Sequence, residues 1–241
     1  MPKPATNAER IITALDVESR AQALALVREL AAARTFKVGL ELFTAEGPPL
    51  LADLKALGKD VFLDLKLHDI PNTVGEAVRV GVRHGVAMMT VHASGGVEMM
   101  SRAAETAAAE AAARGMAKPV LLGVTVLTSL KADDLAAVGM VADPAAQVRR
   151  LAALARQAGM DGIVCSAQEI EIVREVVGPE RLIVTPGIRP AGAAAQDQKR
   201  VMTPALAVAK GSDYLVIGRP ITQAPSPAEA FEKIVAELET A

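Results

Sequence analysis

The sequence is poor in aromatic residues and has no excess of basic charge. Aromatic side chains make up 2% of its 241 residues, with no tryptophan and a single tyrosine, Tyr214. Proteins that hold single-stranded nucleic acids usually stack the bases on aromatic side chains. The formal net charge of −2, from 26 basic and 28 acidic residues, provides no basic field for a phosphate backbone. Both features argue against a nucleic-acid-binding protein.

The chain also has little cysteine and no long apolar run. Cys165 is its only cysteine, so no disulfide can form within the chain, which favours a reducing cytoplasm. No stretch reaches the ~20 apolar residues of a membrane helix. The first ten residues, MPKPATNAER, lack the apolar core of a signal peptide. We therefore expect a cytoplasmic protein that does not bind a membrane.

What the chain does contain is abundant aliphatic residues in a repeating pattern. Hydrophobic residues make up 51% of the sequence, and short apolar runs alternate with longer segments of helical spacing. Such alternation predicts parallel strands joined by right-handed helical crossovers. Eight units fit a (β/α)8 TIM barrel, which typically has ~250 residues. We predict one α/β barrel domain over residues 1–241, with strands at 11–16, 35–38, 61–66, 87–92, 120–126, 162–165, 182–185 and 214–217.

A doubly wound sheet is the main alternative fold. It would place a glycine-rich turn after the first strand, but residues 15–18 read Leu-Asp-Val-Glu. Two connections are longer than the others, at residues 128–143 and 188–199. Long loops of small residues are often active-site lids, although they can also be idle surface loops. Helices are expected at residues 19–33, 72–84 and 96–114.

The third predicted strand carries two charges on one face. Side chains alternate between the faces of a strand, so Val61, Leu63, Leu65 and Leu67 would face the helices. Asp64 and Lys66 would then point into the barrel. Buried charges are tolerated when they are paired and hydrogen-bonded. A structural ion pair is the simpler interpretation, but it gives no reason for a third charge just after the strand.

That third charge is Asp69, and Lys37 ends the second strand. Lys37, Asp64, Lys66 and Asp69 would form an array of alternating sign, in which each charge keeps its neighbours ionised. Such an array suits carbanion chemistry. Asp64 could lie against a substrate carboxylate that leaves as carbon dioxide, while Lys66 stabilises the carbanion and donates a proton to it.

The last two strands indicate a phosphate site. They are followed by Pro186-Gly187-Ile188-Arg189 and by Gly218-Arg219-Pro220. Loops after strands seven and eight frequently bind phosphate in this fold. The glycines let backbone amides approach an anion closely, and arginine binds phosphate oxygens in a bidentate manner. We predict a phosphate-bearing ligand, with solvated surface arginines as the alternative.

The stretch Leu63-Asp64-Leu65-Lys66-Leu67-His68-Asp69-Ile70-Pro71-Asn72-Thr73-Val74 resembles the signature of orotidine 5'-phosphate decarboxylases. The resemblance extends over nearly the whole chain, through residues 14–16, 37–39, 125–128, 185–189, 198 and 218–219. It implies conversion of orotidine 5'-phosphate (OMP) to uridine 5'-phosphate (UMP), the last step of de novo UMP synthesis. The family's reaction needs no cofactor and no metal.

The resemblance also implies roles for individual residues. Lys66 would protonate C6 of the pyrimidine, with Asp64 facing the substrate carboxylate. Asp16 and Lys37 would bind ribose hydroxyls, and Thr128 would contact the pyrimidine edge. Asp69 and Thr73 would cross a homodimer interface and complete the partner's site, with Ile70 as a further substrate contact. The phosphate would be held under a closing lid at residues 188–199, by a group made of Pro186, Arg189, Gln198, Gly218 and Arg219.

Two alternative functions remain open from the sequence. One is a magnesium-dependent relative, such as a 3-keto-gulonate 6-phosphate decarboxylase or a hexulose-phosphate synthase, which carries an acidic metal ligand where this chain has Lys37. The other is a non-catalytic barrel that binds sugar phosphates. The roles of two histidines also stay open. We expect His68 to pack or hydrogen-bond, and His92 to support the site rather than bind a metal.

Overall fold

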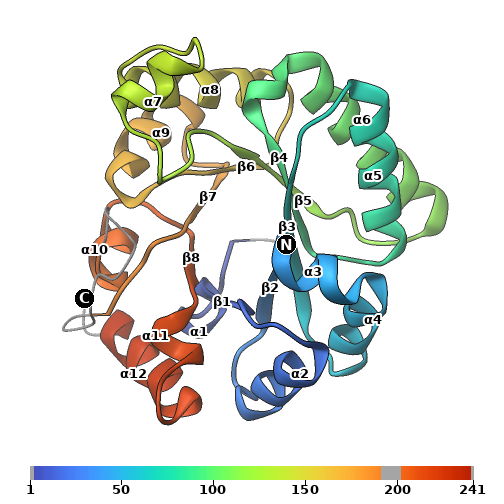
Figure 1. Ribbon diagram of the computed structural model, residues 1–241, viewed down its shortest axis with the longest axis vertical. Helices are drawn as coiled ribbons and strands as arrows, with labels where there is room; N and C mark the ends of the chain where they lie inside the picture. Colours follow the sequence, from blue (N-terminus) through green and yellow to red (C-terminus); the bar gives the residue numbers. More distant parts are fainter. Residues whose placement is uncertain (1–2, 191–201, 240–241) are drawn as a thin grey trace.

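Eight parallel strands form a closed barrel in the computed structural model, which describes residues 3–190 and 202–239 (Figure 1). Each strand pairs with the next, and β8 pairs with β1. The TIM-barrel prediction is therefore confirmed, and the doubly wound alternative was wrong. The strands are β1 (Ile11–Ala14), β2 (Thr35–Gly39), β3 (Asp60–Leu67), β4 (Met88–His92), β5 (Val120–Val124), β6 (Gly162–Val164), β7 (Leu182–Thr185) and β8 (Tyr214–Ile217).

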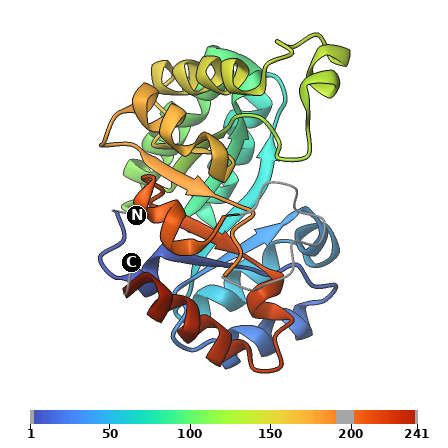
Figure 2. The ribbon, with the colours of Figure 1, turned by 90° about the vertical axis from the view of Figure 1, so that its left-hand side faces the viewer.

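Helices surround the barrel on its outside, as the side view in Figure 2 shows. Within the described residues, no helix is long and apolar enough to cross a membrane. The helices are α1 (Asn7–Arg10), α2 (Arg20–Glu29), α3 (Leu40–Glu46), α4 (Pro48–Ala56), α5 (Pro71–Arg83), α6 (Gly96–Arg114), α7 (Ala132–Ala137), α8 (Pro144–Gln157), α9 (Ile170–Val177), α10 (Pro204–Ala209), α11 (Arg219–Thr222) and α12 (Pro227–Glu239), with 3-10 turns η1 (Ala93–Gly95) and η2 (Ala167–Glu169).

Local sequence signals explain where several elements begin and end. The Ser19 side chain accepts a hydrogen bond from the amide of Gln22 and so caps α2, which ends before the predicted residue 33. Pro71 opens α5 at a position where its missing N–H costs nothing. The long connection after β5 is not wholly irregular, because it contains the short helix α7.

Three strands stop earlier than predicted. β6 ends one residue early, at Val164. β1 and β5 each end two residues early, at Ala14 rather than at residue 16 and at Val124 rather than at residue 126. Single hydrogen bonds still extend both pairings, from the Leu15 amide to the Lys37 carbonyl at 3.0 Å and from the Thr125 amide to the Val164 carbonyl at 3.2 Å. The polar ends of these strands are therefore held in place although they lie outside the regular ladder.

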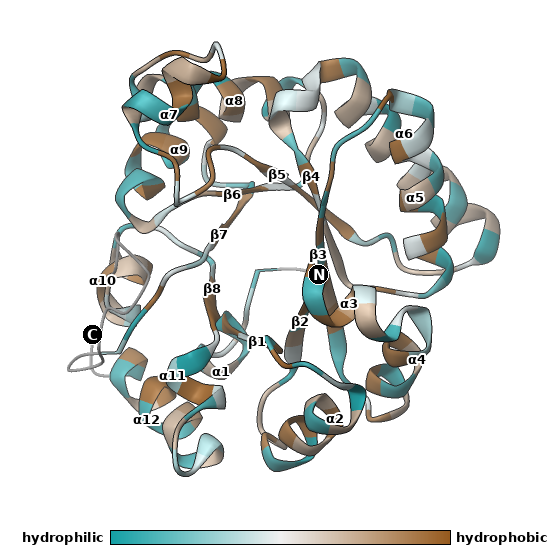
Figure 3. Cartoon of the chain, in the orientation of Figure 1, coloured by the Kyte–Doolittle hydropathy of each residue, from teal (hydrophilic) through white to brown (hydrophobic). Residues whose placement is uncertain are grey.

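Aliphatic side chains fill two separate layers of the core. One layer lies between strands and helices and contains residues such as Phe36, Leu63 and Val91. The other fills the inside of the barrel, where Phe62, Met88 and Tyr214 meet. In Figure 3 the strands at the centre are largely brown, and the helices around them alternate between brown and teal. Because the strands are buried on both faces, a charge that points inward needs a specific partner.

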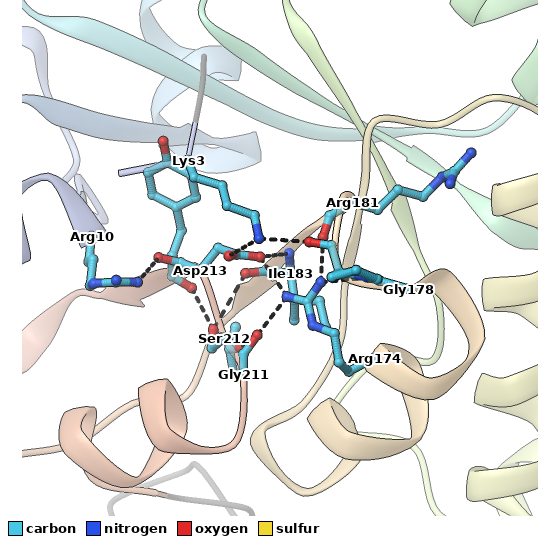
Figure 4. A network of polar contacts seen from close by, with 12 residues as sticks. Lys3, Arg10, Arg174, Gly178, Arg181, Ile183, Gly211, Ser212 and Asp213 are labelled. Atoms are coloured by element: carbon cyan, nitrogen blue, oxygen red, sulfur yellow. Dashed lines mark hydrogen bonds and ion pairs between the residues drawn. The ribbon is translucent and has the colours of Figure 1, made fainter. Parts of the chain in front are cut away.

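A polar network ties β7 to β8 at the end of the barrel where these strands begin (Figure 4). The Asp213 carboxylate accepts hydrogen bonds from Arg174 at 2.7 Å and from the Ile183 amide at 2.8 Å. Arg174 also donates to the carbonyls of Gly178, Arg181 and Gly211. This end of a TIM barrel generally serves stability rather than chemistry.

A second ionic cluster joins α5 to α6, the helices that follow β3 and β4. Glu110 is 6% exposed and accepts hydrogen bonds from Arg83, Arg114 and Arg79. These bonds, of which that from Arg83 contributes most, lower the pKa of Glu110 to about 2. The two helices are thus held together by a carboxylate that stays ionised at all physiological pH values.

Candidate functional site

Two adjoining cavities lie where the strands end. The first is about 180 Å³ and the second about 170 Å³. They share three wall residues, Lys37, Pro186 and Val216. Together the two cavities reach the roughly 300–1,000 Å³ that small-molecule sites occupy. Active sites of this fold lie at the same end of the barrel.

The first cavity contains an ion pair at the end of an otherwise mostly apolar space. The Lys66 ammonium lies 2.8 Å from the Asp64 carboxylate, and the two side chains are 30% and 12% exposed. Both residues line the cavity together with Lys37. The alternation along β3 had placed Asp64 and Lys66 inside the barrel, and the structure places them there.

The backbone at Lys66 has an unusual conformation. Its φ is 51°, and among the described residues it is the only one other than glycine with a positive φ. Regular pairing between β3 and β4 is interrupted between Leu63 and Leu67, which marks a bulge around Asp64 and Lys66. Left-handed backbone is unfavourable for residues with a Cβ, and strained backbone of this kind is concentrated at functional sites.

Lys37 and Asp16 form a second ion pair, at the boundary between the cavities. The Lys37 ammonium donates to Asp16 at 3.1 Å, and the lysine side chain is 13% exposed. Gly39 leaves room for this ammonium, since a Cβ at that position would lie 2.8 Å from it. A pair of this kind offers both a donor and an acceptor to hydroxyl groups of a ligand.

The second cavity is lined by the residues predicted to hold phosphate. Arg189 and Arg219 lie in its wall with Gly187 and Gly218. Gly187 has a φ of 77°, which favours glycine. The amide of Arg189 donates to the Met202 carbonyl at 3.0 Å, beside a bridge between Ile188 and Met202. This pairing fixes the backbone from which the Arg189 side chain extends.

Apolar residues complete the first cavity, and the sequence had not singled them out. Phe62 reaches it from inside the barrel, while Val126, Leu127 and Cys165 line it just beyond the strands. Thr128, which was predicted, lies beside them. Cys165 is buried, and burial raises the pKa of its thiol. Alternation along β3 was the available signal for Phe62, because it shares a face with Asp64.

Some predicted residues lie outside both cavities. Asp69 and Thr73 are exposed, and Ile70 is 66% exposed. The Asp69 carboxylate instead accepts a hydrogen bond from the Ile70 amide at 2.7 Å. A separate groove of about 500 Å³ lies beside Ile70. It is lined by Ile70, Pro71, Asn72, Glu98, Ser101, Arg102 and Glu105. The predicted array of four charges is therefore not assembled within one chain.

Two further predictions concern residues 191–201. Gln198 and most of the predicted lid at 188–199 lie outside the residues that the structure describes. Only the first part of that segment, Ile188 to Pro190, can be placed. Of these residues, Ile188 and Arg189 line the second cavity.

The two histidines lie side by side near the ion pair. The ring centroids of His68 and His92 are 5.4 Å apart. Burial lowers the pKa of His92, and the nearby charges of His68 and Lys66 lower it further. His92 lies at the end of β4, and neither histidine lines the cavities. This position agrees with a supporting role for His92.

Known proteins resemble this chain over almost its full length. The family model described as "Orotidine 5'-phosphate decarboxylase / HUMPS family" matches residues 9–234. A protein named orotidine 5'-phosphate decarboxylase from Vibrio atlanticus (strain LGP32) is 50% identical over 95% of this chain and 97% of that protein. One of the same name from Moorella thermoacetica (strain ATCC 39073 / JCM 9320) is 53% identical over 96% of this chain and 92% of that protein.

Solved structures also resemble this chain over almost its full length. The crystal structure of orotidine 5'-phosphate decarboxylase from Lactobacillus acidophilus superimposes with a TM-score of 0.84 at 38% identity, covering 95% of this chain and 99% of that one. An uncharacterized conserved protein from Geobacillus kaustophilus superimposes with a TM-score of 0.83 at 39% identity and the same coverage.

Proposed function

Because the chain belongs to the orotidine 5'-phosphate decarboxylase / HUMPS family, we propose that it converts OMP to UMP in the two cavities at the end of its barrel. One observation carries the assignment to this site. A partly buried lysine–carboxylate pair lies in a mostly apolar cavity that adjoins a second cavity with two arginines. OMP has the matching distribution of groups, with a pyrimidine carboxylate at one end and a phosphate at the other.

Lys66 is the residue that we assign to the chemistry. When the bond between C6 and the carboxylate breaks, carbon dioxide leaves and the electron pair stays on C6. The Lys66 ammonium stabilises this carbanion and then transfers one proton to it, which yields UMP and a neutral lysine that regains its proton from water. The apolar walls keep competing water away, so the electrostatic interaction is stronger than in solution.

Asp64 holds the Lys66 ammonium in position through their contact of 2.8 Å. Its carboxylate also faces the carboxylate of OMP, and that repulsion ends when carbon dioxide departs. Whether such ground-state repulsion accelerates decarboxylation is contested. The larger part of the catalytic effect is therefore assigned to Lys66.

The ribose, the phosphate and the pyrimidine edge of OMP are assigned to other residues that line the two cavities. Lys37 and Asp16, 3.1 Å apart, bind ribose hydroxyls. Arg189 and Arg219 bind the phosphate with amides near Gly187 and Gly218. Thr128 contacts the pyrimidine edge in the first cavity. Binding energy from the remote phosphate can then be used to organise the reacting end.

The function is tested by following the ultraviolet absorbance of OMP with the purified protein and excess chelator. We expect conversion to UMP at a rate that chelation does not change. Conversion that returns only when magnesium is added would favour the metal-dependent alternative. UMP binding without any conversion would favour the non-catalytic alternative.

We also propose that the chain acts as a homodimer in the cytoplasm. The exposed positions of Asp69 and Thr73, the exposed Ile70 and the groove beside it support an interface at this edge of the barrel. In such a dimer Asp69 and Thr73 would enter the partner's site. The reducing cytoplasm is supported by the single, buried cysteine.

A mixing experiment tests the shared site. Lys66→Ala and Asp69→Ala chains are each expected to be inactive as homodimers. After unfolding and refolding together, the mixed dimers would contain one site with both wild-type residues, so about a quarter of all sites should regain activity. No regain in a sample that contains mixed dimers would show that Asp69 acts within its own chain or not at all.

A further inference from the structure

Thr90 lies behind the Lys66–Asp64 pair and hydrogen-bonds to both residues. It belongs to β4 and is 1% exposed. Its hydroxyl accepts a hydrogen bond from the Lys66 amide at 2.8 Å and donates one to the Asp64 carboxylate at 2.9 Å. The other oxygen of that carboxylate accepts from the Lys66 ammonium at 2.8 Å. The three residues therefore form a closed ring of hydrogen bonds.

The bulge in β3 explains why the Lys66 amide needs this partner. Leu63 and Leu67 are four residues apart, whereas the residues they pair with, Met89 and Val91, are two apart. The extra length of β3 takes the Lys66 amide out of the regular ladder. A buried amide without an acceptor is costly, and the Thr90 hydroxyl supplies the acceptor within the same pair of strands.

The same hydroxyl fixes the carboxylate that orients the ammonium. A hydroxyl rotates freely and can accept from one group while it donates to another. By accepting from the Lys66 backbone, the Thr90 hydroxyl directs its own proton towards Asp64. Asp64 is then held at one oxygen by Thr90 and at the other by Lys66.

We propose that Thr90 is a positioning residue for decarboxylation, an inference that rests on the proposed function. It lines neither cavity, so it acts through Lys66 and Asp64 rather than on the substrate. Its hydroxyl stabilises the left-handed backbone at Lys66 and sets the direction from which the ammonium approaches C6. A misplacement of about 1 Å at a reacting group can cost about 100-fold in rate.

Three variants test this role. Thr90→Val keeps the shape of the side chain but removes the hydroxyl, and we expect kcat to fall roughly 10- to 100-fold. The KM for OMP and the Kd for UMP should change little, because the groups that bind ribose and phosphate are untouched. Thr90→Ser keeps the hydroxyl and should restore most of kcat. If the valine variant does not fold, Thr90→Ala provides the same comparison.

Thr35→Val is the matched control. Thr35 is a fully buried threonine on β2, and its hydroxyl has no hydrogen-bond partner within the described part of the chain. We expect it to keep the wild-type kcat. The proposal is overturned if Thr90→Val also keeps that kcat, if Thr90→Ser loses as much as Thr90→Val, or if UMP affinity falls in proportion to kcat.

The wild-type rate, measured in parallel, separates this proposal from the proposed function. A wild-type chain that does not convert OMP would overturn both. An active wild-type chain with an unaffected Thr90→Val variant would overturn only the role of Thr90.

Discussion

Replacing Lys66 by alanine is expected to reduce OMP turnover by at least about 10⁴-fold while UMP still binds. General acid catalysis typically contributes 10²–10⁴-fold, and a positioned charge in a dry site contributes roughly 10²–10³-fold more. Both are lost with this side chain, whereas the arginines of the second cavity remain. The measurements are single-turnover conversion of OMP and titration with UMP.

Two further variants make this result specific. Lys66→Arg keeps a positive charge, but a guanidinium does not readily release its proton, so turnover should stay low. This result would separate the contribution of proton transfer from that of the positive charge. Lys118→Ala removes a lysine that forms an ion pair with Asp161, and it should leave turnover unchanged. Residual turnover by Lys66→Ala above about one per cent of wild type would contradict the role of Lys66, since it exceeds what a missing general acid allows.

Replacing Arg219 by alanine should lower kcat/KM for OMP by roughly 10²–10⁴-fold, because two hydrogen bonds to a charged group are worth about 1.5–3 kcal/mol each. Arg219 lines the second cavity, whereas the Lys66–Asp64 pair lines the first. The pair should therefore remain in place, and the loss should reflect phosphate binding alone.

A substrate without phosphate provides the decisive comparison. Wild type and Arg219→Ala should convert orotidine, the nucleoside, with the same low efficiency, because neither can use a phosphate contact. Arg28→Ala, which changes an exposed arginine on α2, should behave like wild type with both substrates. An equal loss with OMP and with orotidine would contradict a phosphate role for Arg219.

The alternation of apolar and charged residues was sufficient to predict the barrel and much of the site. It placed Asp64 and Lys66 on the inner face of β3, because sequence spacing determines side-chain direction along a regular strand. The arginines were predicted from their position after the last two strands, where this fold often binds phosphate and where the second cavity lies. Both predictions succeeded because the strands are regular up to the point where the chemistry begins.

The bulge at Lys66 could not be read in the same way. Lysine carries no preference for left-handed backbone, and the acceptor that stabilises it, Thr90, lies 24 residues along the chain. Asp69 was expected beside Lys66, but β3 ends at Leu67 and the chain turns into α5, so the carboxylate binds the Ile70 amide. Contacts between strands, and between chains, are not encoded in the spacing of a single segment.

The division of the site between two arcs of the barrel has a consequence for how such proteins diversify. The Lys66–Asp64 pair belongs to β3, with its hydrogen-bond partner Thr90 on β4, whereas Arg189 and Arg219 follow β7 and β8. Among the described residues, the two cavities share only Lys37, Pro186 and Val216. If the proposed function holds, substitutions on the first arc can change which bond is broken while the second arc still binds phosphorylated compounds. A new reaction can then arise on this scaffold while the residues that bind the substrate's phosphate stay the same.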